Sequence, residues 1–346
     1  MKSLSGEVRH KYAKENRLGA VLFEVTHRCM CDCIHCYLVR EANDELSLVE
    51  IEGLLGQLRA EGVVSVALTG GEPFLREDLP GILQLLRKDH FAVTILTTGI
   101  LVGRAEAGML RRLGVRFAEL SILGADPETH DSIMRYPGAF ERTLRATRFL
   151  RDANVGVALK ATIMTENWQE LPGMARIARD MGAEFSANIS VTPRIDRDAS
   201  PLKLALTRRE LEEVDQGLID GGLIPGEEGR GGGAVLKCPA GGTSAGISPQ
   251  GDLFPCISFR HRLGNVRERT VKEMWHDAPD PFLVELRQVQ PEDVAECFSC
   301  EHRALCRRCP GVAYLETGRL RSPSPSSCRI AGELAWVTER TRSVGG

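Results

Sequence analysis

Three closely spaced cysteines near the start of the chain are the residues most able to do chemistry. Cys29, Cys33 and Cys36 stand in C-x3-C-x2-C spacing within eight residues. Three thiols so close together cannot pair in ordinary disulfides, but they can surround three corners of a cubane iron–sulfur cluster, which normally takes four ligands. One iron would then stay open to a ligand that is not protein.

A zinc site or a set of free thiols is the alternative for this loop. A structural zinc ion requires four closed ligands. His35 could supply the fourth in principle, although its neighbour Cys36 already belongs to the loop. Cys31 interrupts the spacing, and we interpret it as an extra thiol that is not a ligand.

A second motif, Gly70-Gly71-Glu72-Pro73, comes about forty residues later at the end of a predicted strand. Its glycines allow the backbone to approach a ligand closely. Glu72 could accept a hydrogen bond from a ligand ammonium group. A Gly-Gly turn before a helix is common, so the motif is informative only in combination with the cysteine loop and a strand.

Seven further cysteines gather in the last third of the chain. They are Cys238, Cys256, Cys297, Cys300, Cys306, Cys309 and Cys328. Clustered cysteines in a reducing compartment are more often metal ligands than disulfides, and the odd total of eleven argues against complete pairing. Taken by themselves, the two C-x2-C pairs fit zinc as well as iron–sulfur clusters.

The elements that must position these residues alternate between strand and helix. The predicted strands are 20–25, 63–68, 91–96, 115–123, 155–164 and 183–191, and the predicted helices are 48–61, 78–88, 105–113, 139–153, 171–181 and 207–219. Strict alternation implies a parallel sheet in an α/β fold. Six units are too few for a closed eight-fold barrel, so a partial barrel or an open doubly wound sheet is expected. Chemistry then belongs at the carboxyl ends of the strands, where both motifs fall.

Composition excludes several classes of partner. The chain has 346 residues, 42% hydrophobic and 26% charged, and a net charge of −3. Without a basic field, neither nucleic acid nor a membrane surface is expected as a partner. No apolar run is long enough to span a bilayer, and residues 1–14 lack an apolar signal region. We therefore expect a cytoplasmic protein.

The cysteine loop, the strand and the Gly70–Pro73 turn together resemble the radical S-adenosylmethionine (SAM) superfamily. The resemblance implies that Cys29, Cys33 and Cys36 hold a [4Fe-4S] cluster whose open iron binds SAM, while Gly70 to Pro73 hold its methionyl amine. Reductive cleavage of SAM would give a 5′-deoxyadenosyl radical that abstracts hydrogen. The further SAM contacts that the resemblance implies are His35 and Tyr37 at the adenine, and Ser121 and Lys160 at the ribose or carboxylate.

The later cysteines resemble the SPASM domain of peptide- and cofactor-maturing radical SAM enzymes, except that two residues instead of three separate Cys306 from Cys309. The resemblance implies two auxiliary Fe–S clusters of the [4Fe-4S] type with interleaved ligands. One would be held by Cys297, Cys300, Cys306 and Cys328, and the other by Cys238, Cys256 and Cys309. The second set lacks a fourth cysteine, so an open iron, another ligand or a two-iron form are its alternatives.

These observations predict four parts and leave other polar residues without a firm role. The parts are a lead-in at 1–18, a partial (β/α)6 barrel at 19–222, a glycine-rich linker at 223–237, and a SPASM domain with a C-terminal helix at 238–346. The segment 130–135 is interpreted as a capped helix with a solvated Arg135. Glu24 ends the first strand, and Arg194, Asp196 and Arg197 could face substrate.

The resemblance implies maturation of a ribosomally made precursor peptide by crosslinking, oxidation or epimerisation. Only about eighteen residues precede the first strand, too few for a leader-recognition domain, so we expect a separate recognition protein. An electron donor such as flavodoxin or ferredoxin is also expected. The alternatives are a maturase of a small cofactor (haem or quinone type) or of another protein (sulfatase type), and an iron–sulfur or zinc protein without enzymatic activity.

Overall fold

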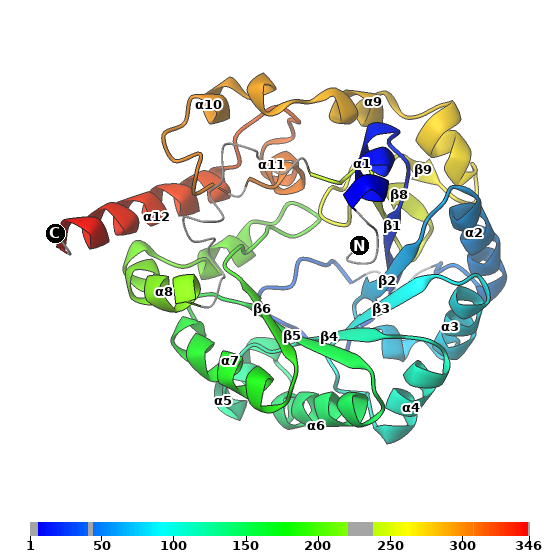
Figure 1. The fold of residues 1–346 in the computed structure, drawn as a ribbon, viewed down its shortest axis with the longest axis horizontal. Helices are drawn as coiled ribbons and strands as arrows, with labels where there is room; N and C mark the ends of the chain where they lie inside the picture. Colours follow the sequence, from blue (N-terminus) through cyan, green and yellow to red (C-terminus); the bar gives the residue numbers. More distant parts are fainter. Residues whose placement is uncertain (1–5, 41–43, 221–237, 307, 345–346) are drawn as a thin grey trace.

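The structure is a computed structural model that describes residues 6–40, 44–220, 238–306 and 308–344 (Figure 1). The strands are β1 Ala20–Thr26, β2 Ser65–Gly70, β3 Ala92–Thr97, β4 Phe117–Ser121, β5 Gly156–Thr162, β6 Glu184–Asn188, β7 Ser244–Ile247, β8 Asp252–Phe254 and β9 Gly264–Asn265. The helices are α1 Gly6–Lys14, α2 Leu48–Ala60, α3 Leu79–Lys88, α4 Arg104–Arg112, α5 Pro127–Met134, α6 Ala139–Asp152, α7 Leu171–Asp180, α8 Arg208–Asp220, α9 Pro281–Gln288, α10 Ala295–Phe298, α11 Pro310–Thr317 and α12 Pro325–Val344. Short turns of helix are η1 Pro73–Leu75, η2 Trp168–Glu170, η3 Ser200–Leu204, η5 Glu273–Asp277 and η6 Pro291–Asp293.

The first six strands form the parallel sheet of an unclosed barrel. The strand order is β6-β5-β4-β3-β2-β1-β7-β8-β9, and every neighbouring pair from β6 to β1 is parallel. In Figure 1 these strands form an arc with α2 to α7 on its outer side. The expected α/β fold with a partial barrel is therefore confirmed.

Local sequence signals explain most element boundaries. Ser47 and Glu50 form a capping box at the start of α2. The second strand begins two residues later than predicted, because Val63 donates its amide to the Leu58 carbonyl and closes α2. The strands β4 and β6 are also shorter than predicted, since only their central residues pair with neighbours.

The two faces of the barrel sheet differ in polarity. Val21, Phe23 and Val25 alternate along β1 and pack into the apolar core beneath the helices. The intervening residues face the interior of the arc, where the register places Glu24 beside Thr69. On the far side of the arc the same face carries Lys160 of β5, which is 48% exposed. The interior of the unclosed barrel is thus polar and open to solvent.

The C-terminal part continues the same sheet. Strands β7 and β8 form an antiparallel hairpin with a turn closed by Gly251 at φ 89°. The pattern did not predict that β7 also pairs in parallel with β1, over Ala20–Phe23 and Ser244–Ile247. The predicted linker at 223–237 lies outside the described residues.

A long C-terminal helix returns to the other end of the arc. Helix α12 packs against α8, beside it in Figure 1. Arg329 donates a hydrogen bond of 2.8 Å to the Leu206 carbonyl, and Arg208 pairs with Glu333. Within the described residues, no helix is long and apolar enough to cross a membrane.

Candidate functional site

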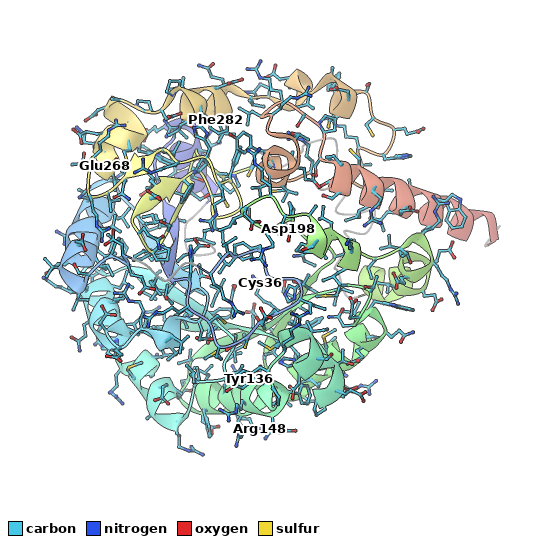
Figure 2. All side chains as sticks on the ribbon, turned by 180° about the vertical axis from the view of Figure 1, so that it is seen from behind. Cys36, Tyr136, Arg148, Asp198, Glu268 and Phe282 are labelled. Carbon is cyan, nitrogen blue, oxygen red and sulfur yellow. The ribbon has the colours of Figure 1, made fainter. Side chains whose placement is uncertain are left out.

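The cysteine loop lies at the carboxyl ends of the parallel strands, and Cys36 is near the middle of Figure 2. The end of α5 holds it through the backbone. The Asp32 amide donates to the Met134 carbonyl and the Ile34 amide to the Ile133 carbonyl, both at 3.1 Å. Arg135, at φ 51°, adds an ion pair of 3.0 Å with Asp32. The segment interpreted as a solvated helix is therefore a support for the cysteine loop.

The loop gathers its thiols around Cys31. The side chain of Cys31 hydrogen-bonds to both Cys29 and Cys33, which lowers the pKa of Cys29 to about 7 and also lowers the pKa of Cys33. The same contacts raise the pKa of Cys31, so it is the thiol that keeps its proton. Burial raises the pKa of Cys36.

An apolar platform from the strand ends supports this group of thiols. Cys31 is only 1% exposed. The residues that pack with it include Ile100, Leu123, Ile133, Met134 and Met164. The carboxyl ends of several strands thus give the thiols a largely water-free base, as a reactive site requires.

The Gly70–Pro73 turn pairs with the chain that leads into the cysteine loop. The Gly71 amide donates to the Thr26 carbonyl at 2.8 Å, and the Glu72 amide donates to the Arg28 carbonyl at 2.9 Å. A Cβ on Gly70 would stand 2.1 Å from the Thr26 oxygen, and one on Gly71 would stand 2.2 Å from the Arg28 oxygen. Gly70 also has φ 126°. The two glycines are therefore required for a close approach between two stretches of backbone.

The Glu72 side chain is fully buried and already satisfied by the protein. It accepts hydrogen bonds from the Thr97 hydroxyl at 2.7 Å, and from the Thr98 amide and hydroxyl at 2.8 and 2.6 Å. The Phe74 amide donates a fourth at 3.3 Å. Burial raises the pKa of Glu72 against these hydrogen bonds. Its carboxylate thus fixes the turn from within the protein.

The predicted adenine contacts lie in the same loop with different surroundings. The Nδ1 atom of His35 is buried without a hydrogen-bond partner, and burial lowers the pKa of His35 to about 4. An orphaned polar atom of a neutral imidazole suits a ligand that hydrogen-bonds. The Tyr37 hydroxyl instead donates to Glu24 at 3.1 Å, and burial raises the pKa of Tyr37.

The predicted ribose or carboxylate contacts are neighbours across two strands. Ser121 of β4 stands opposite Lys160 of β5 in the register. Lys160 pairs with Glu119 at 2.8 Å. Both strand positions belong to the polar inner face, and the Lys160 charge is already compensated by Glu119.

Glu24 is the central acceptor of a buried network that the sequence did not reveal. Arg260 donates to its two carboxylate oxygens at 2.6 and 2.8 Å, and His27 lies 3.2 Å away. Burial raises the pKa of Glu24, but the His27 hydrogen bond and the Arg260 charge outweigh it and lower the pKa overall. Only the strand-end position of Glu24, ahead of the cysteine loop, hinted at this role.

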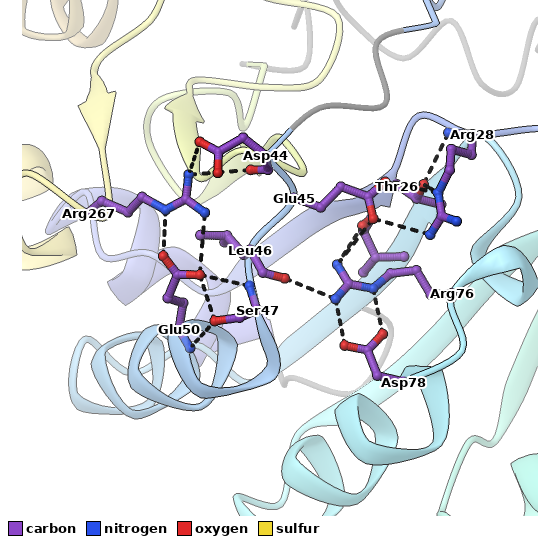
Figure 3. Close-up of polar contacts among 11 residues, drawn as sticks. Thr26, Arg28, Asp44, Glu45, Leu46, Ser47, Glu50, Arg76, Asp78 and Arg267 are labelled. Carbon is purple, nitrogen blue, oxygen red and sulfur yellow. Dashed lines mark hydrogen bonds and ion pairs between the residues drawn. The ribbon is translucent and has the colours of Figure 1, made fainter.

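The segment after the cysteine loop is fixed by two further arginines (Figure 3). Arg76 is buried and donates to the carbonyls of Val25 at 3.0 Å and Leu46 at 2.9 Å. Arg267 pairs with Glu50 at 2.5 Å from the C-terminal part. The Arg76 contacts hold the chain on both sides of the loop, whereas the Arg267 pair holds the start of α2.

The later cysteines gather in two groups that interleave along the chain. Within each group the cysteines lie so close together that the thiolate charge of one raises the pKa of another. One group contains Cys238, Cys256 and Cys309, and the other contains Cys297, Cys300, Cys306 and Cys328. Burial is the largest cause of the raised pKa of Cys238, Cys256, Cys297, Cys306 and Cys328. Cys306 and Cys309 are near neighbours in sequence, yet they belong to different groups, and their ligand roles stay predictions.

The donor sets fit polynuclear clusters better than single ions. All eleven cysteines are free thiols. In the part of the chain that the structure describes, no three His, Cys, Asp or Glu side chains are placed to hold one metal ion. The grouped thiols and the buried, orphaned His35 atom meet the needs of iron–sulfur clusters with thiolate ligands and of a hydrogen-bonding cofactor beside the first.

Comparison with known proteins agrees with this arrangement. Residues 23–178 match the radical SAM superfamily, and residues 238–310 match SPASM, an iron–sulfur cluster-binding domain. The AdoMet-dependent heme synthase of Methanosarcina barkeri is 27% identical over 342 residues, which cover 90% of this chain and 97% of that protein. The subtilosin biosynthesis protein AlbA of Bacillus subtilis is 30% identical over 83% of this chain and 66% of AlbA.

A solved structure shows the same fold. Streptococcus suis SuiB bound to its precursor peptide SuiA superposes with a TM-score of 0.71 at 18% identity, over 93% of this chain and 80% of SuiB. The fold, the cysteine loop with its paired Gly70–Pro73 turn, and the two sequence matches lead to one conclusion. This chain belongs to the radical SAM superfamily and is an enzyme of the type that carries a C-terminal SPASM domain.

Proposed function

We propose that this enzyme modifies a ribosomally made precursor peptide by radical chemistry. The observation that carries the proposal is the backbone pairing of Gly71 and Glu72 with the chain entering the cysteine loop. That pairing places the thiol group and the Gly70–Pro73 turn side by side at the carboxyl ends of the strands. This is the edge at which parallel α/β folds bind ligands.

Particular residues would hold the cofactors. Cys29, Cys33 and Cys36 would ligate a [4Fe-4S] cluster, the backbone of residues 70–73 would receive the methionyl amine of SAM, and His35 would face the adenine. When bound, the cluster and SAM supply one-electron cleavage of SAM and a hydrogen-abstracting radical. The apolar platform around Cys31 excludes water from that place. The two later thiol groups would hold auxiliary clusters that take up an electron or bind substrate.

The polar inner face supports a peptide as substrate. The sheet ends at β6 without closing, and three alternate residues of that strand, Glu184, Ser186 and Asn188, are exposed. Together with Lys160 and Glu119 they give an open surface with hydrogen-bonding groups and charges. An extended chain needs such a surface, because its own amides must find partners. The similarity to AlbA, a bacteriocin biosynthesis protein, points the same way.

The reaction requires partners. We propose a separate small protein that recognises the leader of the precursor, and a flavodoxin or ferredoxin that delivers the electron. The free state of all eleven cysteines suits the reducing cytoplasm.

Maturation of a tetrapyrrole is the second candidate. It is favoured by the match to the heme synthase, which extends over 97% of that protein. The inner face also carries Lys160, which could pair with a carboxylate of a flat ligand if it left Glu119.

One experiment separates these possibilities. The protein is reconstituted anaerobically with iron and sulfide, reduced with dithionite, and supplied with SAM, and 5′-deoxyadenosine is measured by liquid chromatography. Precursor peptides encoded beside the gene and an iron porphyrin with propionate groups are then added in parallel. Faster 5′-deoxyadenosine formation and a mass change in a peptide support the proposal. Stimulation by the porphyrin alone supports the second candidate, and no SAM cleavage in either case contradicts both.

A further inference from the structure

We propose that Glu24 is a positioning residue that couples the segment of the SAM cluster to the segment of the auxiliary cluster that Cys238, Cys256 and Cys309 would hold. The inference rests on the proposed function for the identity of the clusters. Glu24 touches neither predicted cluster ligand set. Its single carboxylate instead binds two side chains beside the first set and one side chain near the other, and through them it fixes the two segments relative to each other.

The first side of the coupling is the cysteine loop. Tyr37 follows Cys36 directly, and its hydroxyl donates to Oε1 of Glu24 at 3.1 Å. His27 stands two residues before Cys29, and its Nε2 lies 3.2 Å from Oε2. Each oxygen of Glu24 therefore holds a residue at one end of the loop, so that the carboxylate spans the C-x3-C-x2-C spacing.

The second side is the turn after β8. Arg260 follows Cys256 by four residues, and the Phe259 amide donates to the Cys256 carbonyl at 2.9 Å, which makes the turn tight. The Arg260 guanidinium also stacks over Phe254, with its carbon 5.1 Å from the ring centre. The side chain is 9% exposed. A movement of Cys256 would consequently be transmitted to the guanidinium instead of being absorbed by a flexible side chain.

Burial strengthens the coupling. Glu24 is fully buried, so its charge has no access to water, and loss of the Arg260 contact would leave a buried charge uncompensated. The two segments come from chain regions 236 residues apart, and the parallel pairing of β1 with β7 already aligns their backbones. The Glu24 carboxylate then fixes the orientation of the two loop ends relative to the turn after β8.

The chain offers a matched control. Arg267 follows β9, seven residues after Arg260, and also pairs with a carboxylate of the barrel, Glu50, at 2.5 Å. The Glu50 carboxylate touches no residue of the cysteine loop, and the Arg267 side chain is 29% exposed. Arg260→Met and Arg267→Met therefore both remove an arginine between the two parts, but only the first disturbs the proposed coupling.

The test compares amide hydrogen exchange, measured by mass spectrometry, in the reconstituted proteins. Arg260→Met should speed exchange about tenfold in residues 27–38, which Arg260 itself does not touch, as well as in residues 256–260. Arg267→Met should leave residues 27–38 unchanged. Tyr37→Phe, which removes a single hydroxyl and should fold, should speed exchange in residues 27–38 alone. Unchanged exchange of residues 27–38 in Arg260→Met would overturn the inference.

A spectroscopic measurement distinguishes coupling from general loosening. The cluster that Cys29, Cys33 and Cys36 would hold is reduced and supplied with SAM, and its electron paramagnetic resonance spectrum is recorded. The spectrum should change in Arg260→Met and in Tyr37→Phe but not in Arg267→Met. An identical spectrum in all three variants would reduce the Glu24 network to an ordinary structural contact and refute the inference. If the wild type makes no 5′-deoxyadenosine, the proposed function fails, while the exchange measurement still judges the coupling by itself.

Discussion

The guanidinium of Arg260 lies 2.6 Å from the carboxylate of Glu24, although 236 residues separate the two along the chain. Both side chains are buried, so the removal of one leaves an uncompensated charge. Arg260→Met should lower the free energy of unfolding by about 3–5 kcal/mol, as for other broken buried pairs. Urea denaturation followed by circular dichroism measures this loss.

Two further variants define the cause. Arg267→Met, at a partly exposed pair, should cost only about 0–1 kcal/mol. The double variant Glu24→Gln with Arg260→Met should be more stable than Arg260→Met alone, because the buried charge is gone. Equal losses of unfolding free energy in Arg260→Met and Arg267→Met would show that the Glu24–Arg260 pair stabilises the fold no more than the Arg267 pair does.

Glu72→Gln tests whether the carboxylate fixes its own turn. Each carboxylate oxygen accepts a backbone amide, from Phe74 on one side and from Thr98 on the other. A glutamine carries oxygen on one side only, so one amide would lose its acceptor, at a cost of about 1–3 kcal/mol. The loss should be present without SAM, in thermal or urea unfolding.

A matched carboxylate serves as the control for this substitution. Glu119→Gln changes a residue whose partner Lys160 is about half exposed, and it should have little effect on unfolding. If Glu72→Gln left stability unchanged and weakened only SAM binding, the side chain would be a ligand contact instead.

Much of the fold could be predicted because the signals are local. The capping box at Ser47 and the alternating apolar residues of the first strand depend on neighbours in sequence, and both appear where expected. The partial barrel follows from repetition of such units. The pairing of β7 with β1 could not be predicted, because β7 has only four residues and nothing in their sequence indicates which strand they pair with.

The candidate site shows the same division. The spacing of Cys29, Cys33 and Cys36 is visible in the sequence, since ligands of one loop must be close together. The partners that support the loop are not visible, because Arg260 and Met134 come from distant elements and Met134 acts through its backbone carbonyl. The glycines of the Gly70–Pro73 turn were noticed, but the close approach that requires them is to Thr26 and not to a ligand.

Cys31→Ala and Cys33→Ala should separate the extra thiol from a ligand. The reconstituted wild type should contain about twelve irons in three clusters. Cys33→Ala should lose about four of them together with SAM cleavage. Cys31 packs into the apolar platform, so Cys31→Ala should keep the iron and the cleavage, with a loss in unfolding free energy of about 1 kcal/mol. Loss of iron in Cys31→Ala would make Cys31 a ligand.

His130 should make stability depend on pH. Its side chain is fully buried, and burial lowers the pKa of His130 to about 4. The unfolded chain therefore binds a proton below about pH 6.5 that the folded chain refuses until about pH 4, and stability falls as pH falls through this range. The contribution of this one group should reach about 3 kcal/mol.

A substitution isolates that contribution. Asparagine can still accept the hydrogen bond that Leu123 donates to Nδ1 of His130, but it does not titrate. The difference in unfolding free energy between pH 7.5 and pH 5 should be smaller in His130→Asn than in the wild type. His90→Asn, at an exposed residue with φ 62°, should leave that difference unchanged. Equal pH dependence in all three proteins would contradict the assignment.

Substitutions at Cys306 and Cys309 test whether the auxiliary ligands interleave. The two residues are three positions apart but belong to different thiol groups. Each single alanine variant should lose about four irons, and the double variant about eight, because two clusters are then incomplete. Cys238→Ala combined with Cys309→Ala should lose no more iron than either alone, since both residues belong to one group. Iron analysis with Mössbauer spectroscopy counts the clusters, and a loss of only four irons in the Cys306 and Cys309 double variant would place both residues on one cluster.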